Sequence, residues 1–155
     1  MNKKEAVELY RSLTGLSLEG VDTKTKIVII RNVGKLKEVS EKFDSERNTA
    51  LEIMKPEGFD EREAEITKLA GKQVTEDIAL LVGSHQAEKA RLEHDFTSFL
   101  YGELDEDTKK RSGGLLNEDA DVDLEKITGE AFEKIVEANE KVEPEKLSVL
   151  LKIVG

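Results

Sequence analysis

Residues 21–54 read VDTKTKIVIIRNVGKLKEVSEKFDSERNTALEIM, and this stretch decides the fold. Eight positions within it repeat in alternating steps of four and three, the heptad spacing that keeps one stripe of a helix against a partner helix. The eight positions are Ile29, Val33, Leu36, Ser40, Phe43, Arg47, Ala50 and Met54. At about 1.5 Å per residue, such a helix is a rod of roughly 50 Å. We therefore predict one long helix whose apolar seam is covered by a returning helix or by a second chain.

The seam has polar interruptions and an apolar base. Arg47 stands where an apolar residue belongs, and two interpretations are open for it. Either the far half of the helix packs loosely with the arginine stem lying along the seam, or a glutamate on a facing helix pairs with the guanidinium. Ile27 to Ile30 are apolar on every side, so we expect this base to be the most buried part of the helix.

A break and a restart follow the long helix. Pro56-Glu57-Gly58 ends it, because proline removes a backbone donor and clashes with the preceding turn. Asp60 is expected to cap the next helix, with Phe59 and Ala64 forming the hydrophobic staple. Residues 21–102 are then a long antiparallel helical hairpin.

The two ends of the chain are expected to form the base of that hairpin. Asn2 with Glu5 matches a capping box for a first helix, and Thr128 can cap a later one. Residues 16–18 alternate, and Val122 with Leu124 lie on one face of a short extended piece that can pair with them.

The last segment has two readings. Residues 147–154 fit helical spacing and strand alternation equally well, and Pro144 at a first helical turn favours helix. The predicted fold is thus a single, mainly α domain over residues 1–155. It consists of the hairpin on a small α+β base made from residues 1–20 and 115–155.

Composition limits the function classes. The 155 residues include no cysteine, which excludes disulfides, thiolate metal sites and cysteine nucleophiles. Charged residues make up 37% and aromatic residues 5%, which is typical of helical rods with a thin core. No apolar run approaches the roughly 20 residues needed to cross a bilayer. The N-terminus lacks an apolar signal core, so we expect a soluble, cytoplasmic protein without membrane contacts.

The formal net charge of −10 is unevenly distributed. The first 58 residues carry 11 basic and 10 acidic residues, whereas the rest carry 13 and 24. This acidic balance makes nucleic acid an improbable partner, because binding needs net attraction to phosphate. The short basic stretch over residues 24–37 allows only a local contact, and it is also typical of a solvated helix face.

The sequence offers two hypotheses for a metal site. His85 and His94 are nine residues apart, which places them on opposite sides of one helix, so they do not share a metal there. No acidic residue stands three before either histidine, as a di-iron bundle requires.

An acidic segment gives the second reading, which is a calcium loop. Asp119, Asp121, Asp123 and Glu130 fill positions 1, 3, 5 and 12 of such a loop. Leu124 replaces the glycine needed at position 6, so an acidic, solvated segment is the expected alternative. We therefore predict neither a metal nor another cofactor.

The order of elements resembles small uncharacterised helical proteins encoded by tailed phages and prophages. The matching parts are residues 13–20 (LTGLSLEG), residues 23–26 (TKTK) with the charged hairpin, residues 122–124 (VDL), and two short helices over 128–139 and 144–154. The resemblance implies a role in virion assembly or host interaction, and it carries no catalytic residues.

No catalytic motif is present: a Gly-x-Ser-x-Gly elbow, a phosphate loop and a dinucleotide fingerprint are all missing. We predict a non-enzymatic interaction or assembly protein that self-associates or binds a protein partner. The expected interaction residues are Val33, Leu36, Phe43, Arg47 and Met54. The alternatives are an acidic regulatory or calcium-binding module and an enzyme without a recognisable motif.

Overall fold

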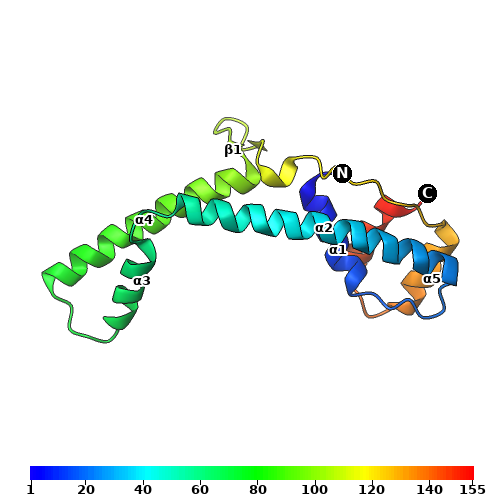
Figure 1. Cartoon of the computed structure of the whole chain (residues 1–155), viewed down its shortest axis with the longest axis horizontal. Helices are drawn as coiled ribbons and strands as arrows, with labels where there is room; N and C mark the ends of the chain where they lie inside the picture. The colour runs from blue at the N-terminus through cyan, green and yellow to red at the C-terminus, as the bar shows by residue number, and fades with distance from the viewer. The chain divides into compact units, whose positions relative to one another are not determined.

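The computed structural model describes all of residues 1–155, and the fold is mainly α-helical, as predicted. The chain forms two compact units, one made of residues 1–45 and 116–155 and the other of residues 46–115. The elements, in chain order, are α1 (Lys3–Thr14), α2 (Thr23–Met54), α3 (Phe59–Lys68), α4 (Glu76–Tyr101), β1 (Glu103–Leu104), β2 (Arg111–Ser112), η1 (Leu115–Asn117), α5 (Gly129–Ala138), α6 (Pro144–Ser148) and η2 (Val149–Ile153). Figure 1 shows α2 as one unbroken helix.

The core of the first unit is built from both ends of the chain. The predicted capping box starts α1, since Glu5 N–H donates to the Asn2 side chain and Asn2 N–H donates to Glu5. Helix α1 then packs against η2 near the C-terminus. The buried cluster draws on α1, α2, α5 and η2, and it contains Ala6, Leu9, Leu13, Val21, Ile29, Leu36, Ile127, Ala131, Ile135, Leu150 and Ile153.

Helix α2 turns its predicted seam inward over its first two thirds. Asp22 caps the helix by accepting hydrogen bonds from the backbone N–H and the hydroxyl of Thr25. The buried residues of α2 are Thr25, Ile29, Asn32, Leu36, Ser40 and Phe43. Leu36 belongs to the core of the first unit, so the two ends of the chain cover this part of the seam. The expectation that a returning helix or a second chain covers it is wrong here, because the terminal segments already fill that position.

The expected buried base of α2 is wrong for two of its four residues. Ile29 is buried and Val28 is half-buried, but Ile27 and Ile30 are 43% and 65% exposed. The reason is that the core contacts only one side of α2, so a run that is apolar all round presents its far side to solvent.

The expected pairing of residues 16–18 with Val122 and Leu124 is also wrong. The first unit instead contains two isolated bridges, Asn2 with Asp119 and Ile127 with Val154. Residues 16–18 are fixed by a side chain, because Asn139 accepts a hydrogen bond from Ser17 N–H and donates to the Ser17 carbonyl, both at 2.8 Å. A single asparagine thus supplies the hydrogen bonds that a neighbouring strand would have supplied.

The last third of the first unit is helical, as preferred from the sequence. Thr128 caps α5 through its hydroxyl, which accepts from Ala131 N–H at 3.1 Å. Residues 147–154 are not a strand; they continue α6 into the 3₁₀ helix η2, and Val154 alone makes a bridge.

In the second unit, the return of the chain is divided between two helices. Gly58, with φ of 77°, caps α3 without a side chain, so the expected Asp60 cap is wrong. Asp60 pairs with Lys55 instead, at 3.2 Å. Helix α3 is only 10 residues long and ends at Lys68. Thr75 then caps α4, because its hydroxyl accepts a 3.3 Å hydrogen bond from Ile78 N–H. Helix α4 is therefore the long returning helix. Figure 1 shows α3 close to α4 at the start of α3 and diverging from it toward the end of α3.

The segment after α4 closes on itself. Strands β1 and β2 form a short antiparallel hairpin in which Glu103 pairs with Ser112. Gly102 and Gly114 flank this hairpin with φ of 92° and 83°, and a Cβ on Gly114 would lie 2.3 Å from the backbone nitrogen of Gly102. Only glycine fits this approach of two backbones.

Candidate functional site

A polar cluster joins α3 to α4 in the second unit. Its centre is His85 of α4, whose side chain is only 3% exposed and whose ring lies 4.8 Å from that of Phe59, measured between centroids. Phe59 is the one buried residue of α3. The sequence places His85 on a helix but carries no sign of these partners, which come from a different helix.

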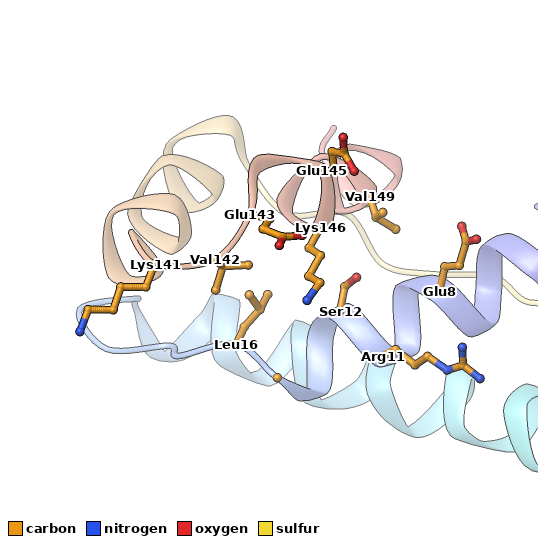
Figure 2. A pocket seen from close by; sticks show the side chains of 11 residues that line it. Glu8, Arg11, Ser12, Leu16, Lys141, Val142, Glu143, Glu145, Lys146 and Val149 are labelled. Atoms are coloured by element: carbon orange, nitrogen blue, oxygen red, sulfur yellow. The ribbon is translucent and has the colours of Figure 1, made fainter.

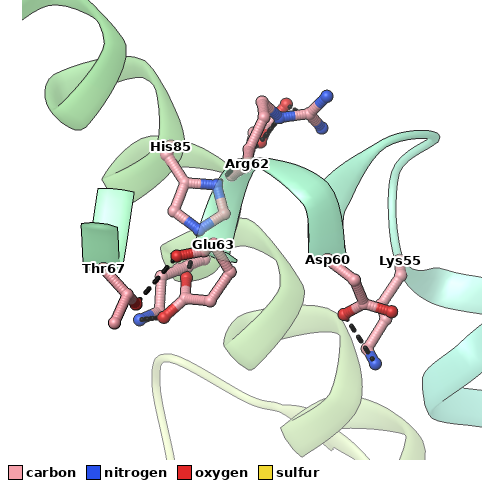
Figure 3. A network of polar contacts seen from close by, with 8 residues as sticks. Lys55, Asp60, Arg62, Glu63, Thr67 and His85 are labelled. Atoms are coloured by element: carbon pink, nitrogen blue, oxygen red, sulfur yellow. Dashed lines mark hydrogen bonds and ion pairs between the residues drawn. The ribbon is translucent and has the colours of Figure 1, made fainter. Parts of the chain in front are cut away.

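Both ring nitrogens of His85 face carboxylates. Nε2 makes a short contact with Glu63 of α3 (Figure 3), and Nδ1 lies 3.3 Å from Oε2 of Glu88. Arg62 binds both oxygens of Glu88 at 2.9 Å, and Lys89 reaches Glu63 at 3.3 Å. Each carboxylate is therefore paired across the two helices with a permanently positive side chain: Glu88 of α4 with Arg62 of α3, and Glu63 of α3 with Lys89 of α4.

The pKa values of the two carboxyl groups follow from these contacts. The hydrogen bond from His85 is the main cause that lowers the pKa of Glu63, and Lys89 adds to it. Burial is the largest single influence on Glu88 and raises its pKa, but the bonds and charges of Arg62 and His85 together outweigh it, so the pKa is lowered.

The polar cluster of Arg62, Glu63, His85, Glu88 and Lys89 links two helices, and we call it the clamp. The ring of His85 is enclosed, so neither nitrogen reaches a substrate in solution. Its carboxylate neighbours are already paired with Arg62 and Lys89. What the cluster does is hold α3 against α4 through charged hydrogen bonds, which are stronger than neutral ones.

The five residues predicted to interact fall into different environments. Leu36 and Phe43 are buried within the single chain, Val33 and Met54 are half-buried, and Arg47 is exposed. The exposed Arg47 fits the loosely packed far half of the helix better than a buried ion pair. The interaction role of these residues stays a prediction.

The acidic residues that match positions of a calcium loop make separate contacts. Asp119 lies 3.7 Å from the N-terminal amine and accepts a hydrogen bond from Asp121 N–H. The backbone carbonyl of Asp123 accepts from Lys35, and Glu130 lies in the first turn of α5. The structure contains no group of three or more histidine, aspartate or glutamate side chains arranged to hold a metal ion.

A groove of about 730 Å³ lies in the first unit between α1 and the segment that joins α5 to α6. Figure 2 shows its side chains, with Leu16, Val142 and Val149 as the apolar part. Its acidic and basic residues are equal in number: Glu8, Glu143 and Glu145 against Arg11, Lys141 and Lys146. Ser12 is the only hydroxyl in the lining, and no histidine accompanies it as a base.

Exposed apolar side chains gather on the outer faces of two helices. On α2 these are Ile27, Ile30 and, near its end, Ile53, and on α4 Leu80 is 67% exposed. Val74, in the turn before α4, is 72% exposed. Other apolar residues of this region are only half-buried: Ile66 of α3, Leu69 just after it, and Ile78, Leu81 and Val82 of α4.

The comparisons with known proteins add no relative. No protein-family model matches the chain, and neither a curated protein nor a solved structure is significantly similar to it. Among its helices there is none with an apolar stretch long enough to span a bilayer.

Proposed function

We propose that this protein is a non-enzymatic helical interaction or assembly protein, and that helices α3 and α4 of its second unit bind a protein partner or another copy. One observation carries the proposal. Helices α3 and α4 form a layer with only Phe59, His85 and Leu100 buried, while Val74 and Leu80 stand in solvent. Two helices without a covering third layer leave apolar surface exposed, and such surface commonly marks an interaction site.

The clamp around His85 supports this reading. Charged hydrogen bonds, rather than a thick apolar core, hold α3 to α4. The apolar side chains of this end are thereby left for contacts outside the chain. A role in phage assembly or host interaction, inside the bacterial cytoplasm, is the biological setting that the resemblance of element order implies.

Affinity capture with the full chain tests the proposal. The bait is the wild type, the double variant Val74→Ser/Leu80→Ser, or the matched control Ile53→Ser, which changes an equally exposed residue at the end of α2. The lysate comes from cells that make the protein, and it also contains a differently tagged copy of the chain.

The expected result is one protein, either a partner or the tagged copy, that is retained by the wild type and by the control but lost with the double variant. Retention of nothing specific by the wild type, or equal retention by the double variant, would contradict the proposal. Circular dichroism checks that all baits are folded, as is expected for changes at exposed positions.

A further inference from the structure

The outer face of α2 carries a short apolar row with a notch. Ile27, Ile30 and Gly34 follow the spacing i, i+3 and i+7, which places them on one side of the helix. All three are exposed, and nothing lies within 4 Å of the position that a Cβ on Gly34 would occupy. Two bulky side chains are thus followed by a vacant position.

The outer face of α4 has the same spacing with the sizes in a different order. Leu80, Gly83 and Ala87 are also i, i+3 and i+7, and all three are exposed. Nothing lies within 4 Å of a Cβ built on Gly83. Here one bulky side chain is followed by two small positions.

The two rows fit each other when the helices run antiparallel. Ile27 then meets Ala87, Ile30 meets the notch at Gly83, and Leu80 meets the notch at Gly34. A large side chain faces a small one at each level, which is how ridges of one helix pack into grooves of another.

The charges of the two faces are complementary as well. Arg31 and Lys35 of α2 bind residues of their own unit, and Glu88 of α4 belongs to the clamp. The charges left on the two faces are Lys24, Lys26 and Lys37 on α2 against Glu76 and Asp77 on α4. In the antiparallel pairing, Lys37 lies opposite Asp77. Complementary charge favours encounter and fixes the register of such contacts.

We propose that the row Ile27, Ile30 and Gly34 on α2 of one copy packs against the row Leu80, Gly83 and Ala87 on α4 of a second copy. This names the partner for the proposed interaction function and rests on it. Because the two rows are different surfaces, the contact is heterologous, and each copy offers both halves of it. Repetition therefore produces a ring or a chain of copies.

The test uses variants that each disable one face. Ile30→Glu disables the α2 row, and Leu80→Glu disables the α4 row; the exposed Ile53→Glu is the control. Sedimentation velocity of the full chain over a wide concentration range measures association. Since covering one isoleucine is worth about a tenfold change in affinity, we expect each single variant to associate at least roughly tenfold more weakly than the wild type and the control.

Mixing distinguishes this geometry from a symmetric one. Ile30→Glu retains a working α4 row and Leu80→Glu a working α2 row, so an equimolar mixture forms one-to-one dimers that grow no further. Exchange of the opposed charges, Lys37→Asp with Asp77→Lys in one chain, restores the association that either change alone weakens. Gly34→Leu fills the notch and abolishes association, although it favours the helix itself.

Three results would overturn the inference. If the wild type stays monomeric at every concentration, a second copy is not the partner and this inference fails. The proposed function would then still be supported if affinity capture retains a different protein. Association that only one of the two faces affects indicates a symmetric dimer. An inert mixture of the two variants excludes the pairing of these rows.

Discussion

Replacing Asn32 by alanine tests how α2 is fixed in the first unit. Asn32 is fully buried, and its side-chain NH₂ donates to the backbone carbonyl of Glu125 at 2.8 Å. In return, Glu125 N–H donates to the Asn32 side-chain oxygen at 2.9 Å. This pair imitates the backbone pairing of two strands, and it attaches residues 120–126, which have no regular structure, to the long helix.

The size of the effect follows from these contacts. Each hydrogen bond contributes about 1 kcal/mol net, and a buried peptide group left without a partner costs about 1 kcal/mol more. Glu125 is only half-buried, so water replaces part of what is lost. We expect Asn32→Ala to lower the free energy of unfolding by about 2–3 kcal/mol. Asn32→Asp should cost at least as much, because it sets a carboxylate against the Glu125 carbonyl.

Urea unfolding followed by circular dichroism measures the stability change, and hydrogen exchange at the Glu125 amide gives a local readout. The matched control is Asn48→Ala, an exposed asparagine on the same helix, which should stay within about 0.5 kcal/mol of the wild type. The reasoning would be refuted if Asn32→Ala were as stable as the control and the Glu125 amide exchanged at the wild-type rate.

Three further predictions concern the core, the clamp and the hairpin. Leu36→Ala should cost about 2–5 kcal/mol in urea unfolding, whereas the 78% exposed Ile53→Ala should change little; equal effects would contradict the buried seam. The lowered pKa of Glu63 means that its contribution to stability is complete above the unfolded value of about 4.3 and is lost as pH falls through the lower folded value. The protection factors of the α3 amides, which correct for the pH dependence of intrinsic exchange, should therefore fall in acid, and Glu63→Gln should flatten this dependence; protection that does not change with pH would count against the clamp. Gly114→Ala should lower the stability of the protein by at least about 2 kcal/mol, because φ is positive at this position and the backbone of Gly102 leaves no room for a Cβ. Gly34→Ala should raise the stability by up to about 1 kcal/mol, because the position is open and alanine favours the helix. Thermal melts measure both changes.

Local signals in the sequence predicted much of the helical fold. The caps at Asn2 and Thr128 and the break after Met54 depend on neighbouring residues only, so the sequence contains their whole cause. The seam from Ile29 to Phe43 is likewise periodic in the chain itself. These predictions were correct because neighbouring residues alone determine such features, and contacts with distant parts of the chain do not change them.

Features that depend on a distant partner were missed. Asn32 reads as a surface residue of a charged helix, since its partner is 93 residues away and is a backbone group that no side-chain pattern reveals. His85 has the same difficulty, because its burial depends on Glu63 and Phe59 from another helix. The wrong cap at Asp60 shows that a good local pattern loses when Gly58 can take a left-handed conformation and start the helix by itself.

The division of the chain into units also constrains the order in which it can fold during synthesis. Residues 46–115 are contiguous, so the second unit can form its contacts soon after it leaves the ribosome. The first unit must wait, because Ile127 pairs with Val154 and the core includes Leu150 and Ile153. Until then, the inner face of α2 is made but uncovered, and Leu36 and its neighbours are the nascent segment that a chaperone would have to shield.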